Sequence, residues 1–133
     1  MKRLMIFVLT ILIVSLACNS IAASAERFDM LCERLKKKDS TALNLIVQDY
    51  RDFLNNTFDE NLKKSQIFSL EYAMKNGFLS TASHIAQTYR LVGDSKKSFK
   101  IYKALADLGD AQSQGIIGVM YKNGEGTKQD YNE

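Results

Sequence analysis

The chain has 133 residues, of which 46% are hydrophobic and 25% are charged, as in an ordinary folded domain. It contains no proline, so nothing interrupts the hydrogen-bond ladder of a helix, and this composition favours an all-α fold. The 18 basic residues exceed the 15 acidic ones by only three. This balance lacks the concentrated basic charge that nucleic-acid binding requires, so we expect no nucleic-acid partner.

The first 25 residues have the pattern of a secretory leader. Two basic residues precede a long apolar run, and the small residues Ala23-Ser24-Ala25 follow it. A leader peptidase accepts only short side chains just before the cut, so we predict cleavage between Ala25 and Glu26. The protein is then periplasmic or secreted. Residues 4–25 are also long enough to span a bilayer, so the alternative is an uncleaved inner-membrane anchor, the one case in which we expect contact with a membrane.

The two cysteines lie on either side of the predicted cut. Cys18 leaves with the leader, unless it is the site of lipid attachment, a third outcome in which Ser15 replaces the usual aliphatic residue. Cys32 then has no disulfide partner in the exported chain. Helix packing alone must therefore stabilise the fold.

Apolar residues recur at spacings of three and four along six predicted helices. The helices cover about residues 28–37, 40–54, 60–76, 80–91, 95–108 and 111–122. Ser40 and Asp110 are the predicted N-caps of the second and the sixth. On the third helix we expect the following side chains to face the core: Leu62, Ile67, Leu70, Ala73 and Met74. The connections are short, so successive helices must fold back as antiparallel hairpins.

One stretch of sequence recurs after 32 residues. Residues 77–89 read GFLSTASHIAQTY and residues 109–121 read GDAQSQGIIGVMY. The aligned pairs are Gly77 with Gly109, Ile85 with Ile117, Ala86 with Gly118 and Tyr89 with Tyr121. We expect the small residues of the third pair to let a neighbouring helix approach closely, and the tyrosines to fill the space one turn later. A two-helix repeat of this period predicts a short α-solenoid after the leader.

A longer pattern covers the C-terminal part of the chain. Its residues, in order, are Tyr102, Ala106, Gly109, Asp110, Ala111, Gln114, Ile117, Gly118, Met120, Tyr121, Gly124, Gly126, Gln129, Asp130 and Tyr131. This order resembles the Sel-one-like repeat family, a relative of the tetratricopeptide repeat. The resemblance is specific over 96–133 and weakens upstream to about Leu70. We therefore divide the chain into the leader (1–25), an N-terminal helical hairpin (26–61) and the repeats (62–133).

The resemblance implies a non-enzymatic protein that binds a protein or peptide partner on a stacked-helix surface. Lys96, Lys100 and Lys103 share one helix face. In tetratricopeptide-like solenoids the first helix of each pair lines the concave groove, so by resemblance these lysines meet an acidic peptide. The other interpretation is a solvated outer face, where Asp107 forms a weak pair with Lys103.

Residues 127–133 are similar to the start of a further repeat whose first helix is missing. We therefore expect Ile116, Val119 and Met120 to be uncovered, and to dock either another protein or a second copy of the chain. Two alternatives stay open: a truncated remnant of a longer repeat protein without a function of its own, and a regulatory subunit of a cell-envelope enzyme.

Few residues have the pattern of a reactive site. His84 has no carboxylate at helical spacing, and Cys32 lies on an apolar stripe where cysteine acts as a small hydrophobe. Metal sites need clusters of His, Cys, Asp or Glu. The glycine-rich segment 123–126 lacks the Lys-Ser/Thr ending of a phosphate-binding loop. We predict no catalytic residue, no cofactor and no metal ion.

Overall fold

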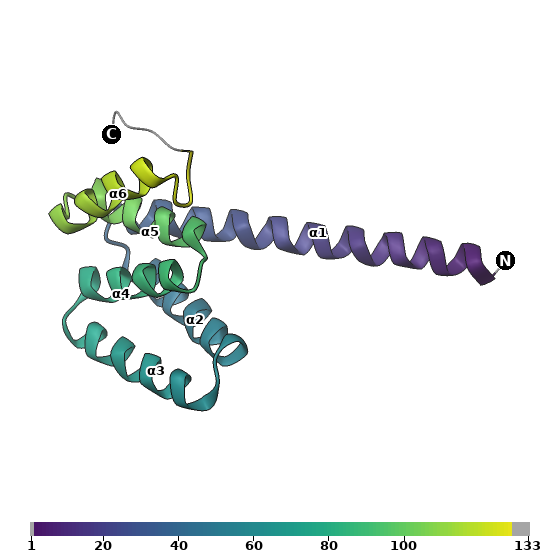
Figure 1. The fold of residues 1–133 in the computed structure, drawn as a ribbon, viewed down its shortest axis with the longest axis horizontal. Coiled ribbons are helices and arrows are strands. Elements are labelled where there is room, and N and C mark those ends of the chain that lie inside the picture. Colours follow the sequence, from purple (N-terminus) through teal and green to yellow (C-terminus); the bar gives the residue numbers. More distant parts are fainter. Residues whose placement is uncertain (1, 129–133) are drawn as a thin grey trace. The chain divides into compact units, whose positions relative to one another are not determined.

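The computed structural model describes residues 2–128, and side chains from residue 5 onward except that of residue 7. These residues form six α-helices and no strand, which confirms the predicted all-α fold (Figure 1). The helices are α1 (Lys2–Leu35), α2 (Ser40–Thr57), α3 (Glu60–Lys75), α4 (Phe78–Leu91), α5 (Ser95–Asp107) and α6 (Ala111–Asn123). The chain divides into two compact units, Met1–Met30 and Leu31–Glu133, which are described separately.

The first unit is the greater part of α1. This helix runs without a break through the predicted cut between Ala25 and Glu26, because no glycine or proline occurs along it. Its 34 residues correspond to a length of about 51 Å. Its apolar side chains are exposed from Met5 to Ile21. The stretch Val8–Leu35 is long and apolar enough to cross a membrane, a form that a secretory leader and a membrane anchor share.

Aspartate side chains cap four helices of the second unit. Asp94 accepts a hydrogen bond from the backbone N–H of Lys97 at the start of α5, and Asp110 accepts one from Ser113 at the start of α6. The Asp110 cap confirms the prediction, and Asp94 directly precedes the predicted start of its helix at residue 95. The predicted cap Ser40 is wrong, because Ser40 is the first helical residue and Asp39 before it accepts the cap hydrogen bonds. The corresponding cap of α3 is Asp59.

Two glycines, at equivalent places in the repeat, allow the chain to turn between helices. Gly77 separates α3 from α4 with a φ of 101°, and Gly109 separates α5 from α6 with a φ of 90°. Side-chain-bearing residues rarely adopt this left-handed backbone, so glycine is the residue that lets each hairpin turn within so few residues. Gly109, one of the aligned residues of the repeat, therefore acts in the turn and not in helix packing.

The core of the second unit lies where each helix packs on its neighbours in the chain. α4 packs against α3 and α5, α5 packs against α6, and α2 contacts both α3 and α4 (Figure 1). The largest fully buried apolar or aromatic side chains are Leu31, Leu35, Ile46, Tyr50, Leu54, Leu70, Ile85, Tyr89, Ile101, Leu105 and Met120. Removal of these side chains from water is the main stabilising contribution to such a stack.

A small polar and aromatic cluster joins α2, α3 and α4 inside this core. The side-chain oxygen of Gln66 accepts hydrogen bonds from the hydroxyls of Tyr50 and Thr88, each at 3.4 Å. The rings of Tyr50 and Tyr89 meet edge to face at 5.8 Å, and Phe53 packs on Tyr89 at 5.1 Å. Burial raises the pKa of both tyrosines, so both are neutral at pH 7.

The two copies of the repeated segment agree in part in their burial. Ile85 and Ile117 both lie in the core, and Ala86 is fully buried as expected. The expectation for Gly118 is wrong: a Cβ added there would meet no atom within 4 Å. Among the described residues α6 packs mainly on α5, and this point of the helix lies away from that contact.

Helix α3 is covered less than its sequence pattern predicts. Leu70 and Ala73 are buried, but Leu62 and Met74 are 50% and 41% exposed. The predicted inward orientation of these two side chains is wrong. Among the described residues, α3 packs mainly on α2 and α4, along a stripe too narrow to cover the wider apolar face that periodicity suggests.

Candidate functional site

The predicted basic stripe lies on α5, where one of its members is partly neutralised. Lys103 pairs with Asp107 at 3.5 Å, and Lys36 reaches the same carboxylate at 3.3 Å. Lys96 is exposed and Lys100 is half-buried. Lys96 is therefore the most exposed member of the stripe.

The three apolar residues predicted at the surface of α6 differ in exposure. Val119 is 47% exposed, and Ile116 is half-buried. Met120 is fully buried, so its predicted place on a docking surface is wrong. Ile117 and Met120, three residues apart, share the stripe of α6 that faces the core. The predicted start of a further helix lies mostly in residues 129–133, outside the described part of the chain.

Aromatic and ionic contacts hold this C-terminal region in place. Tyr121 is half-buried and meets the ring of Phe99 on α5 edge to face at 5.3 Å. After α6, the carboxylate of Glu125 accepts two hydrogen bonds from the guanidinium of Arg90 on α4, at 2.6 and 2.9 Å. Arg90 lowers the pKa of Glu125 to about 2, so the pair is ionised at pH 7. These contacts fix α6 and its following loop against α4 and α5.

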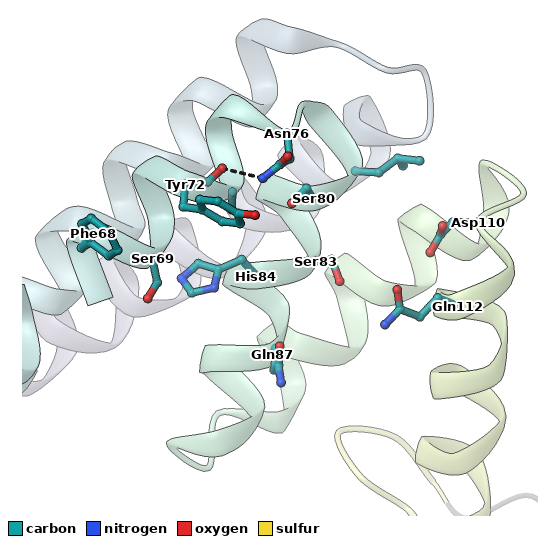
Figure 2. A pocket seen from close by; sticks show the side chains of 12 residues that line it. Phe68, Ser69, Tyr72, Asn76, Ser80, Ser83, His84, Gln87, Asp110 and Gln112 are labelled. Atoms are coloured by element: carbon teal, nitrogen blue, oxygen red, sulfur yellow. Dashed lines mark hydrogen bonds between the residues drawn. The ribbon is translucent and has the colours of Figure 1, made fainter. Parts of the chain in front are cut away.

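A second surface is a groove of about 620 Å³ between α3, α4 and the start of α6, here called the α3–α4 groove (Figure 2). Phe68 and Tyr72, one turn apart on α3, form one wall, and they are 73% and 67% exposed. Gln87 of α4 and Gln112 of α6 contribute exposed amides. In Figure 2, His84 lies between the aromatic wall and the amides.

His84 is a half-buried member of the groove. Its Nε2 is closed to solvent and has no hydrogen-bond partner among the described residues. Its ring meets Tyr50 edge to face at 6.1 Å. Burial lowers the pKa of His84, so the imidazole is neutral at pH 7. A buried polar atom without a partner costs on the order of 1–3 kcal/mol, so a hydrogen-bonding ligand that reached it would recover part of that cost.

The lining of the α3–α4 groove carries almost no charge. Among the described residues that line it, Asp110 is the only carboxylate, and the N-cap hydrogen bond from Ser113 at 2.8 Å already occupies one of its oxygens. The same part of the chain contributes no lysine or arginine to the lining. Among residues 2–128, no group of three or more His, Cys, Asp or Glu side chains is arranged to hold a metal ion.

Sequence reasoning did not identify the α3–α4 groove. One signal was present: Phe68 and Tyr72 are four residues apart and lie off the buried stripe of α3. Two aromatic residues on the polar face of a helix are a reason to look for a binding surface. The contribution of Gln112 depends on how α6 packs, which the spacing of residues does not determine.

Comparison of this chain with protein-family models, with curated proteins and with solved structures found no match. The class established by the structure is an all-helical stack that follows a long apolar N-terminal helix.

Proposed function

We propose that the chain is an exported, non-enzymatic recognition module of the Sel-one-like repeat type, which binds a protein partner on the surface of its α5–α6 hairpin. The observation that carries this proposal is the side chain of Val119, 47% exposed on a helix whose other large apolar residues are at least half-buried. Exposed apolar side chains bordered by charge are typical of protein interfaces. Lys96, exposed on α5 of the same hairpin, favours an acidic segment in the partner.

The rigidity of this hairpin supports the proposal. The contact between Phe99 and Tyr121 packs α5 against α6, and the ion pair between Arg90 and Glu125 ties the following loop to α4. A surface held in one conformation loses little entropy on binding, so a modest contact area can still give useful affinity.

We also propose that the leader is cut between Ala25 and Glu26, which makes the protein periplasmic or secreted. A cut there would leave Glu26 and Asp29 in the first turn of the shortened helix, where negative charge stabilises the helix dipole. Intact-mass measurement of the exported protein tests this. The mass of residues 26–133 supports cleavage, the mass of the whole chain supports an inner-membrane anchor, and a lipid adduct on Cys18 supports a lipoprotein.

Site-specific cross-linking in cells tests partner binding. A photoreactive amino acid replaces Val119, and the matched control carries it at Gln48, which is exposed on α2. We expect one discrete protein adduct from position 119 and none of that size from position 48. Equal adducts from both positions, or an adduct of position 119 with a second copy of the chain alone, would contradict a specific heterologous partner at this surface.

A further inference from the structure

We propose that the α3–α4 groove binds a neutral saccharide. The inference goes beyond the protein-binding function, since it concerns a different surface: the groove lies between α3, α4 and the start of α6, whereas the protein-binding surface lies on α5 and the second half of α6. Its volume of about 620 Å³ lies within the usual range of small-ligand sites and leaves room for a short oligosaccharide.

The charge of the groove decides what it can recognise. Phosphate, carboxylate and acidic peptide ligands are most often held by lysine or arginine side chains, and none of the described residues that line the groove is a lysine or an arginine. A cationic ligand would meet a single carboxylate, Asp110, and the N-cap hydrogen bond from Ser113 already occupies one of its oxygens. The imidazole of His84 is neutral at pH 7 because it is half-buried. This lining favours an uncharged ligand.

The polar groups of the groove match a ligand rich in hydroxyls. A hydroxyl both donates and accepts hydrogen bonds, and so does each primary amide. Amides reach the groove from three places: Asn76 at the end of α3, Gln87 on α4 and Gln112 on α6. The side chain of Asn76 is oriented by its hydrogen bond to the carbonyl of Tyr72 at 2.9 Å (Figure 2). Ser80 and Ser83 add two hydroxyls between these amides.

The aromatic wall supplies the apolar contact that a sugar ring needs. A pyranose has C–H groups on one face, which pack against the electron-rich face of an aromatic ring. Phe68 and Tyr72 lie about 6 Å apart along the helix axis, so each can contact a separate part of one extended ligand. Both rings are largely exposed, so contact with a ligand would remove apolar area from water.

A peptide fits the same groove less well. Strand addition needs a free sheet edge, and residues 2–128 contain no strand. An amphipathic helix needs an apolar groove, whereas serines, amides and a histidine make up most of this lining. A proline-rich peptide shares the preference for aromatic rings, and it is therefore the competing ligand that the test includes.

The test is an NMR titration of the purified full-length chain, with chitotriose and maltotriose as neutral oligosaccharides and an uncharged proline-rich hexapeptide as the competitor. For a shallow, exposed groove we expect a Kd on the order of 1 mM, so the titrations extend to about 10 mM. At least one of the two sugars should shift the side-chain amide signals of Gln87 and Gln112, and the peptide should not.

Three variants make the test specific. Replacement of Tyr72 by alanine (Tyr72→Ala) should weaken sugar binding at least tenfold, and Gln87→Ala should weaken it several-fold. Glu71→Ala, an exposed change on α3 outside the groove lining, should leave the Kd unchanged. The proposal is overturned if neither sugar shifts the groove signals, if the peptide alone does so, or if the Tyr72 and Glu71 variants bind equally well while both keep the wild-type circular dichroism spectrum.

Discussion

The loop after α6 lies against the backbone of α5 at Gly126, and this contact can be tested by a graded series of Gly→Ala changes. Gly126 has a φ of 72°, and a Cβ built on it would lie 2.6 Å from the carbonyl carbon of Ser95 and 2.9 Å from the Cβ of Phe99. The Ser95 carbonyl oxygen is closer still. Real Cβ atoms essentially never show contacts under 3.0 Å, so alanine at this position must push the loop away from α5.

The size of the effect follows from two contributions. A left-handed backbone costs an alanine about 1–2 kcal/mol. Movement of the loop also pulls Glu125 away from Arg90, and hydrogen bonds to charged groups are worth about 1.5–3 kcal/mol. The two side chains of this ion pair are 35% and 26% exposed, which reduces that second contribution, so we expect Gly126→Ala to cost about 3 kcal/mol in total.

Two other glycines are matched controls. Gly109 also has a positive φ of 90°, but a Cβ there has open space, so Gly109→Ala should cost only about 1 kcal/mol. Gly118 is helical with open space around it, so Gly118→Ala should stabilise the fold by about 0.5–1 kcal/mol. The last result would also confirm that no neighbouring helix packs closely against Gly118.

Thermal unfolding followed by circular dichroism, with every variant in the same buffer and detergent, ranks the variants by Tm. For a unit of this size each kcal/mol shifts the Tm by about 4–8 °C, so Gly126→Ala should lower it by about 10 °C or more. The reasoning is refuted if the Gly126 and Gly109 variants unfold at the same temperature. That result would mean that the loop does not touch α5.

Three further predictions concern charges. Glu125→Gln removes the ion pair with Arg90 and should lower the free energy of unfolding in urea by about 1 kcal/mol at pH 7. Because the folded pKa of Glu125 is lowered to about 2, the stabilisation by this pair is present above about pH 4.5 and fades as the pH falls towards 2. An equal cost of the substitution at pH 2 would contradict this assignment. Burial lowers the pKa of His84, so the unfolded chain binds the proton more readily and the free energy of unfolding should fall as the pH drops below about 6.5. His84→Gln should remove this pH dependence, and a pH dependence that persists in the variant would show that another group causes it. Asp110→Ala should cost about 1 kcal/mol through loss of the α6 N-cap, and an unchanged urea midpoint would show that the cap is dispensable.

The sequence predicted the helices well because their signals are local. Apolar spacing, aspartates at helix starts and glycines at turns act within a few residues, so five of the six helices begin and end close to their predicted bounds. The first helix differs: it was predicted from Phe28, but it continues from the leader because nothing in residues 2–35 interrupts it. Asp39, and not Ser40, is the N-cap of α2, because its carboxylate accepts hydrogen bonds from two backbone N–H groups and pairs with Arg34 at 2.7 Å.

The candidate sites were harder to predict because exposure depends on which helices meet. Val119 and Met120 are adjacent apolar residues, and only the packing of α6 on α5 shows that the first is exposed and the second is buried. Likewise, the α3–α4 groove forms from residues that lie more than 40 positions apart, between Phe68 and Gln112. The spacing of apolar residues within one helix does not predict a contact between residues so far apart in the sequence.

The most direct test of the proposed recognition function is the affinity of the cross-linked partner for the purified chain. Val119→Asp places a charge on the exposed side chain that carries the proposal, and it should raise the Kd at least tenfold without a change in Tm. Gln48→Asp, an exposed change on α2, is the matched control and should leave the Kd unaltered. Equal affinities for wild type and Val119→Asp would contradict a partner-binding surface on the α5–α6 hairpin.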